Sequence, residues 1–275
     1  MARPDPWRGG SFGERGTCLL APNPGMMTLD GTNTWVLREP GASRVVVVDP
    51  GPVEDGHLDL LVESLDDVAL VLLTHHHHDH SEVANAFADA KHCSVRALDP
   101  AFCHRGDPLR DGEEIEVEGL GLRVLTTPGH TADSVSFVLP ADRALLSGDM
   151  VLGRGTTVVA YPDGQLAPYF DSLERMRAVA ESEVDVVWPA HGPVLDDAAG
   201  VLDHYRDHRQ ARLAQVRAAL GELGLSPASL DPGVADDDTV PRQVVEVVYA
   251  DVDESLWGAA ELSVRAQLGY LAVHG

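Results

Sequence analysis

Residues 74–80 read Thr-His-His-His-His-Asp-His and place four candidate metal ligands in one short stretch: His75, His77, Asp79 and His80. The stretch follows an apolar run, which predicts a buried strand that ends in a loop. Side chains alternate along an extended segment, so His75 and His77 face the same way and can bind one ion. Imidazole and carboxylate are the ligands that Zn²⁺ and similar ions prefer. Four donors divided by a turn favour two adjacent ions over one.

A histidine run can also be a tag or a surface metal scavenger. This run lies inside the chain, directly after a predicted core strand, and contains an aspartate, which favours a metal site. His76 and His78 alternate with the candidate ligands, so we expect them to support those ligands or to face solvent.

Three later strand-like runs also end in a candidate ligand. In each, a β-rich run stops at small or turn-forming residues, and one histidine or aspartate stands there: His130, Asp149 and His191. Small neighbours allow the backbone to bring such a ligand close to an ion. A single case would be weak support, but three of them downstream of the histidine run reinforce one another.

The order of predicted elements indicates an α/β layered domain, because strands and helices alternate from the first strands to residue 200. Residues 1–17 are rich in Gly, Pro and Arg and are expected to form a flexible N-terminal arm. We expect residues 18–200 to form the catalytic domain and residues 201–275 a smaller helical domain.

Composition limits the range of functions. The chain has 275 residues, 44 acidic against 20 basic, and a net charge of −24, which opposes loose, charge-driven binding of polyanions. It lacks an apolar run long enough to span a membrane, and no secretory signal is visible at its start, so a cytoplasmic location is expected. Cys18, Cys93 and Cys103 form no CxxC motif and fit a reducing compartment.

Together, the candidate ligands resemble the metallo-β-lactamase superfamily, whose motif series is His-x-His-x-Asp-His, His, Asp, His in this order. The resemblance implies a four-layer αβ/βα sandwich with the metals at one edge of the sheets. It also implies two Zn²⁺ ions: one bound by His75, His77 and His130, the other by Asp79, His80 and His191, with Asp149 bridging both. True β-lactamases typically lack the bridging aspartate, so the family name does not give the activity.

Further motifs are similar to the β-lactamase-like protein 2 group, at residues 31–34, 127–134, 147–153, 189–193 and 204–209. That group carries a C-terminal winged-helix-like domain and includes an endoribonuclease that acts on single-stranded RNA. One departure is Ser81-Glu82, where relatives often have Gly-Gly, and it alters the helix entry beside the metals.

The resemblance therefore implies a dinuclear-zinc hydrolase in which hydroxide formed at the ions attacks a phosphodiester of single-stranded RNA. Asp79 and Asp149 would be the catalytic carboxylates. The alternative is a hydrolase of thioesters or small acyl compounds resembling glyoxalase II, which the acidic surface favours mildly. A third hypothesis is an iron-dependent regulatory or redox protein, although such relatives usually carry a flavodoxin domain.

Several supporting roles are also predicted. Ser147 or Thr131 is expected to orient the imidazoles, and Tyr205 and Arg209 to approach the substrate from the cleft wall. The C-terminal domain has few basic residues, so packing on the catalytic domain or homodimerisation is expected rather than a grip on nucleic acid. No membrane partner is expected.

Overall fold

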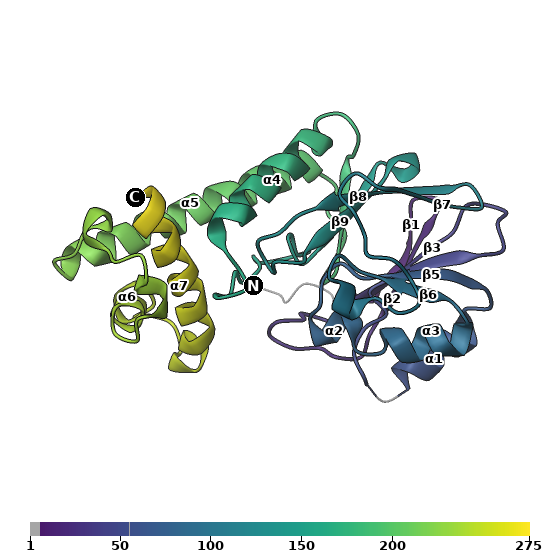
Figure 1. Cartoon of the computed structure of the whole chain (residues 1–275), viewed down its shortest axis with the longest axis horizontal. Helices are drawn as coiled ribbons and strands as arrows, with labels where there is room; N and C mark the ends of the chain where they lie inside the picture. Colours follow the sequence, from purple (N-terminus) through teal and green to yellow (C-terminus); the bar gives the residue numbers. More distant parts are fainter. Residues whose placement is uncertain (1–5, 55) are drawn as a thin grey trace.

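Two β-sheets stack on each other in the computed structural model, which describes residues 6–54 and 56–275; they lie on the right in Figure 1. The first sheet has the order β1 (Gly10–Phe12), β2 (Gly16–Leu20), β3 (Asn33–Leu37), β4 (Val45–Val48), β5 (Val68–Leu72), β6 (Ser94–Arg96). The second has the order β11 (Val186–Pro189), β10 (Ala144–Gly148), β9 (Val135–Leu139), β8 (Leu120–Thr126), β7 (Glu114–Val117). The β4–β5, β5–β6 and β10–β11 pairs are parallel and the other pairs antiparallel.

The sheets pack face to face because their strands are apolar on both sides. In β4, Val46 and Val48 join the core between the sheets, while Val45 and Val47 pack under the helices on the outer face. This alternation follows from the period of two along a strand. The rings of Trp35 and Trp188 stack across the inner core with their centroids 4.8 Å apart.

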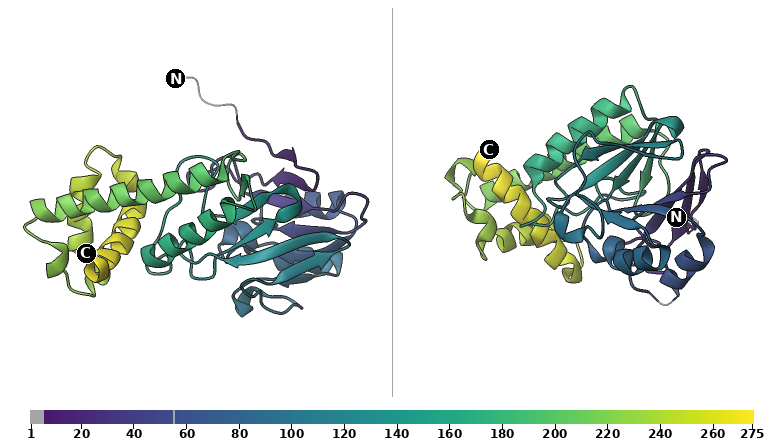
Figure 2. Two further views of the ribbon diagram at one scale, coloured as in Figure 1. Left: turned by 90° about the horizontal axis from the view of Figure 1, so that it is seen from above. Right: turned by 45° about the vertical axis from the view of Figure 1, so that its right-hand side comes forward.

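Helices cover the outer face of each sheet and complete four layers (Figures 1 and 2). The first sheet is covered by α1 (His57–Ser64) and α3 (Ala84–Lys91), whose Leu61 and Phe87 are fully buried. The second sheet is covered by α4 (Leu166–Ala180) and α5 (Ala198–Glu222). The predicted α/β sandwich is therefore confirmed. Short 3-10 turns occur at Pro100–Phe102, Pro140–Asp142, Pro227–Ser229, Val234–Asp236 and Glu254–Leu256.

The C-terminal helices pack around the far half of α5, which extends beyond the sandwich (Figure 2). They are α6 (Val240–Val248) and α7 (Trp257–His274). Val264 and Leu268 of α7 belong to the same apolar cluster as Leu145 and Val187 of the second sheet. This cluster therefore runs without a break from the sheet through α4 and α5 into the C-terminal helices.

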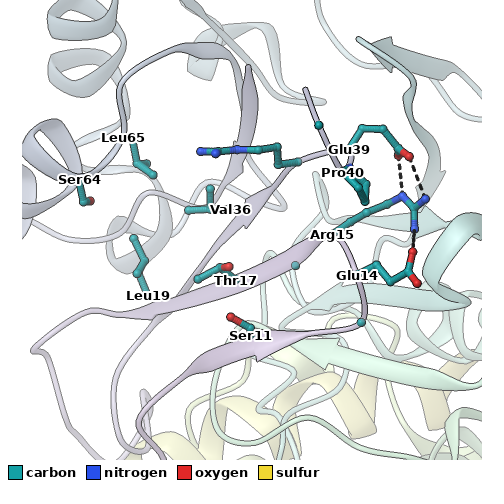
Figure 3. Close-up of a pocket in the computed structure, with 14 residues that line it drawn as sticks. Ser11, Glu14, Arg15, Thr17, Leu19, Val36, Glu39, Pro40, Ser64 and Leu65 are labelled. Atoms are coloured by element: carbon teal, nitrogen blue, oxygen red, sulfur yellow. Dashed lines mark hydrogen bonds and ion pairs between the residues drawn. The ribbon is translucent and has the colours of Figure 1, made fainter. Parts of the chain in front are cut away.

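The N-terminal segment differs from the flexible arm expected over residues 1–17. Gly10–Phe12 and Gly16–Leu20 form an antiparallel pair, and residues 1–5 lie outside the described part. Two kinds of contact hold the pair in place. The ring centroids of Phe12 and Trp35 are 5.7 Å apart, and Arg15 forms ion pairs with Glu39 and Asp142. Figure 3 shows Arg15 beside Glu39 and Glu14 in the hollow at this edge of the first sheet.

Two smaller expectations concern the cysteines and the membrane. Cys18 and Cys93 are buried free thiols, and Cys103 is a half-buried one. Among the described residues, no helix is both long and apolar enough to cross a membrane.

Candidate metal centre

The seven candidate ligands converge at one edge of the sandwich, each within a few residues of the end of a strand or within the short helix that follows β5. His75 follows β5, His77 caps α2 (His78–Ser81), and Asp79 and His80 lie within α2. The other three follow β8, β10 and β11, which run in the same direction: His130, Asp149 and His191. Because these strands end at the same edge, the topology gathers residues up to 116 positions apart, from His75 to His191.

One cluster consists of three histidines whose ring nitrogens point at a common centre. His77 Nδ1 lies 2.9 Å from His75 Nε2 and 3.1 Å from His130 Nε2. Three such atoms within 4.8 Å of one another can hold a metal ion. The first half of the predicted ligand set is therefore brought together.

A second cluster lies beside it and contains Asp79, His80 and His191. The Asp79 Oδ2 atom lies 3.4 Å from His80 Nε2 and 3.2 Å from His191 Nε2. Asp149 lies between the clusters: its Oδ1 is 3.4 Å from His191 Nε2, and its Oδ2 is 3.6 Å from His130 Nε2. One carboxylate thus faces both clusters, which is the arrangement that a bridging ligand needs.

The nitrogen and oxygen atoms of the two clusters are better placed to bind metal ions than to form hydrogen bonds with one another. His80 Nε2 and Asp149 Oδ1 are buried and have no hydrogen-bond partner among the described residues. Leaving buried polar atoms unpaired is costly unless another group, such as an ion, satisfies them. Imidazole nitrogens and carboxylate oxygens in sets of three are typical of catalytic zinc sites.

The three histidines of the first cluster are largely neutral without metal. Burial lowers the pKa of His75 well below its usual value and, with the neighbouring imidazoles of His130 and His80, lowers the pKa of His77 to about 4. Burial also lowers the pKa of His130. Neutral imidazole is the form that binds metal, so this cluster is ready to bind at neutral pH.

The second cluster has the opposite tendency. Burial disfavours the charged form of His191, but Asp149 and Asp79 outweigh it and raise the pKa of His191 to about 9. In the same way Asp79, Asp149 and Asp49 raise the pKa of His80 against the effect of burial. A metal ion at this cluster must therefore displace protons.

Asp49, which the sequence did not mark as a site residue, orients candidate ligands from both clusters. Its Oδ2 accepts hydrogen bonds from Thr74 Oγ1 at 2.6 Å and lies 2.9 Å from His80 Nδ1, while its Oδ1 accepts from Thr74 N at 2.8 Å. Thr74 Oγ1 in turn lies 3.0 Å from His75 Nδ1. Carboxylates behind metal-binding histidines fix the ring orientation and the tautomer. Asp49 follows an apolar strand and precedes Pro-Gly, the same signal that marks the later ligands.

Backbone carbonyl groups orient the other two single histidines. His130 Nδ1 lies 2.8 Å from Val158 O and 3.2 Å from Thr157 Oγ1, and His191 Nδ1 lies 3.2 Å from Gly31 O. The expectation that Ser147 or Thr131 orients imidazoles is not met. Ser147 Oγ donates to Val151 O, and Thr131 Oγ1 donates to Asp133, because both hydroxyls face away from the rings.

Glycine is required beside two of the ligands. Gly148, before Asp149, has φ +53°, and an added Cβ would lie 2.8 Å from Thr74 Cβ. Gly129, before His130, has φ +144°, and an added Cβ would lie 2.4 Å from the Tyr169 Cα atom. The small residues next to the ligands thus allow the close backbone approach that the sequence predicts.

The remaining residues of the histidine run point elsewhere. His76 Nδ1 lies 2.8 Å from Asp133 Oδ1, and His78 is exposed. Ser81, which follows the run, donates from Oγ to His76 O and His77 O. This side chain therefore holds the turn that separates the two halves of the ligand set.

Tyr205 and Arg209 do not reach the cleft. Both side chains are buried, and Tyr205 OH accepts from Leu152 N at 2.7 Å. Arg209 donates from Nη2 to Thr157 O. They lie behind the segment that lines the cleft because α5 packs on its inner side. On the same helix, burial and the charges of Arg209 and Arg212 lower the pKa of His208 to about 4.

A pocket of about 250 Å³ opens over the candidate metal centre. His77, Asp79, His130 and Asp149 form its floor, and its walls are mostly apolar: Met26, Met27, Leu29, Leu152 and Val158. Among the described lining residues Arg154 is the one arginine or lysine, and it forms an ion pair with Asp30. The larger hollow of Figure 3 contains none of the seven candidate ligands.

Comparison with known proteins assigns the fold and the chemistry to a family. The Metallo-beta-lactamase superfamily profile matches residues 27–191, which include all seven candidate ligands. The chain belongs to the metallo-β-lactamase superfamily. A second profile, the Beta-lactamase associated winged helix domain, matches residues 241–274. This metallo-β-lactamase superfamily member is a metal-dependent hydrolase, and its candidate ligands lie at the edge of its sandwich.

Individual relatives match most of the chain. A beta-lactamase-like protein 2 homolog of Drosophila melanogaster is 32% identical over 94% of this chain and 87% of its own length. An atrochrysone carboxyl ACP thioesterase of Aspergillus chevalieri is 32% identical over 86% of this chain and 74% of its own. A crystal structure of a metallo-beta-lactamase family protein from Thermus thermophilus has a TM-score of 0.71 and 24% identity, and covers 92% of each chain.

Proposed function

We propose that this metallo-β-lactamase superfamily hydrolase cleaves thioesters of apolar acyl groups, using two zinc ions. The observation that carries the proposal is the pocket: apolar side chains stand over the converging ligands, and Met26 and Met27 are 71% and 55% exposed at its rim. Exposed methionines adapt to apolar surfaces of varied shape. The thioesterase named among the relatives supports the same reaction type.

His75, His77 and His130 would hold one ion and Asp79, His80 and His191 the other, with Asp149 between them. When bound, the ions lower the pKa of a water and polarise the acyl carbonyl group. Asp79 is the more open of the two central carboxylates, with 29% of its side chain exposed against 10% for Asp149. It lines the pocket, so it can orient the water and accept its proton as the water oxygen bonds to carbon. The C–S bond then breaks, and the thiolate takes up a proton.

Single-stranded RNA finds less support from the same geometry. Binding of RNA depends on cationic contacts to phosphates. Arg154 is neutralised by Asp30, and the chain carries a net charge of −24. The bound ions supply local positive charge, but the walls around them offer apolar contact.

The test uses zinc-loaded protein and two substrate classes. Release of thiol from a series of acyl thioesters of increasing chain length is followed with a thiol reagent, and cleavage of a labelled single-stranded RNA is followed in parallel. We expect thioester turnover that improves with acyl length and falls more than about a hundredfold in Asp149→Asn. Asp171→Asn, at an exposed position of α4, is the matched control and should retain full activity.

Met27→Ser tests the pocket separately. It should raise KM for long acyl chains more than for acetyl thioesters, because it removes apolar contact without touching a ligand. RNA cleavage that depends on Asp149, without thioester turnover, would overturn the proposal. Metal analysis showing a single ion, or iron in place of zinc in protein purified from its source, would overturn the dinuclear zinc centre.

A further inference from the structure

The segment from Met150 to Val158 follows one candidate ligand, Asp149, in the sequence and contacts another, His130. It also forms one wall of the pocket. It begins directly after Asp149 and ends at Val158, whose carbonyl oxygen lies 2.8 Å from His130 Nδ1. Thr157 Oγ1 lies 3.2 Å from the same nitrogen. Because it has no regular secondary structure, its shape depends on contacts with other elements.

Three of these contacts come from side chains of the helical layer behind it: Tyr169, Tyr205 and Arg209. Tyr169 of α4 donates from its OH to Met150 O at 2.7 Å. Tyr205 of α5 accepts from Leu152 N at 2.7 Å and lies 3.2 Å from Gly155 O. These tyrosines secure the first half of the segment.

Arg209 secures the second half, next to His130. Its guanidinium donates to Thr157 O and lies 5.0 Å from the centroid of the Tyr169 ring. The side chain is only 4% exposed, and its Nε has no hydrogen-bond partner among the described residues. Burying a charge is costly, so a neutral apolar residue would pack this position at lower cost if packing were its only role.

We propose that Arg209 is a positioning residue for the metal ion held by His75, His77 and His130. It fixes Thr157, and Thr157 with Val158 holds the His130 ring in the orientation that presents Nε2 to the ion. Arg209 lies on α5, so this helix takes part in building the metal centre.

The proposal makes an asymmetric prediction, because the second cluster has other supports. His191 Nδ1 faces Gly31 O and His80 Nδ1 faces Asp49. The segment reaches the second cluster through Gly153 N, which donates to His191 O at 2.8 Å, and Gly153 lies in the first half, which the tyrosines secure. Loss of Arg209 should therefore weaken the binding of one ion and leave the affinity for the other unchanged. A purely structural role would lower the stability of the fold without separating the two ions.

The experiment measures both metal dissociation constants of the full chain by competition with a chromophoric chelator. We expect Arg209→Ala and Thr157→Val to weaken one binding step by about tenfold and to leave the other within about twofold. Arg209→Lys, which can still donate to Thr157 O, should recover most of the affinity. Arg217→Ala, at an exposed position of α5, is the matched control.

Cobalt substitution identifies the affected ion, since the visible spectrum of Co²⁺ reports its ligand geometry. If Arg209→Ala fails to fold, Thr157→Val provides a second variant in which Arg209 is retained. Unchanged affinity in both variants, or equal weakening of both steps, would overturn the proposal. The inference rests on metal binding in the proposed function but not on the substrate. If wild-type protein binds no metal, the proposed function fails; if it binds two ions and the variants match it, only the role of Arg209 fails.

Discussion

Replacement of Asp49 by Asn tests how strongly the metal centre depends on a residue that touches no ion. His80 must present an unprotonated Nε2 to a metal, so its proton must lie on Nδ1 and be donated to Asp49 Oδ2, 2.9 Å away. The other oxygen of Asp49 accepts from Thr74 N. An asparagine can satisfy only one of these two donors with its carbonyl oxygen.

The amide therefore conflicts with one partner in either orientation. If the NH₂ group faces His80, it donates to Nδ1, so the ring proton moves to Nε2 and blocks binding of the ion. If the NH₂ group faces Thr74, it meets the Thr74 N–H group, and both are donors. We expect weakening of the second-cluster ion by about tenfold to a hundredfold, equivalent to about 1.4 to 2.8 kcal/mol. Asp49 has φ 52°, a conformation that asparagine adopts readily, so the backbone should not change.

Chelator competition on the wild type and on Asp49→Asn measures this loss directly. Asp133→Asn is the matched control, because Asp133 is also a nearly buried carboxylate beside a histidine of the run, His76, which is not a candidate ligand. Wild-type affinity in Asp49→Asn, or an equal loss in Asp133→Asn, would refute the reasoning.

Three further outcomes are expected. Gly148→Ala should lower the free energy of unfolding by about 1–3 kcal/mol in urea, because its Cβ would meet Thr74 at 2.8 Å. Gly221→Ala, at an open position of α5, should be neutral or slightly stabilising; equal effects would contradict the steric argument. The pKa of His208 is lowered to about 4 in the folded protein, so as the pH falls His208 becomes protonated in the unfolded chain before it does in the folded one. The free energy of unfolding should therefore fall as the pH drops from about 6.5 towards 4. In thermal denaturation, His208→Gln should make the Tm depend less on pH over this range. An unchanged slope of Tm against pH would reject the role of His208. Removing metal with a chelator should lower the Tm, and zinc should restore it; an unshifted Tm would mean that the ions do not stabilise the fold.

The sequence by itself determined the types of the candidate ligands, their order and the strands that precede them. These features depend on local patterns: apolar runs that end in small residues, and a histidine spacing that matches the strand period. The predicted α/β layering follows from the same alternation of strands and helices. Such signals lie within a few residues of each other and need no knowledge of the folded chain.

The tertiary structure alone decided how the ligands are supported. Asp49 precedes His80 by 31 positions, and Tyr205 lies 53 positions from Leu152, so neither contact has a local signature. The N-terminal strands were missed for the same reason: glycine-rich residues pair only because Phe12 and Arg15 find partners elsewhere in the chain. Tyr205 and Arg209 were assigned to the cleft wall, yet packing of α5 turns them behind it. Which face of a helix meets which loop depends on the packing of whole layers, and that is settled only when the chain is folded.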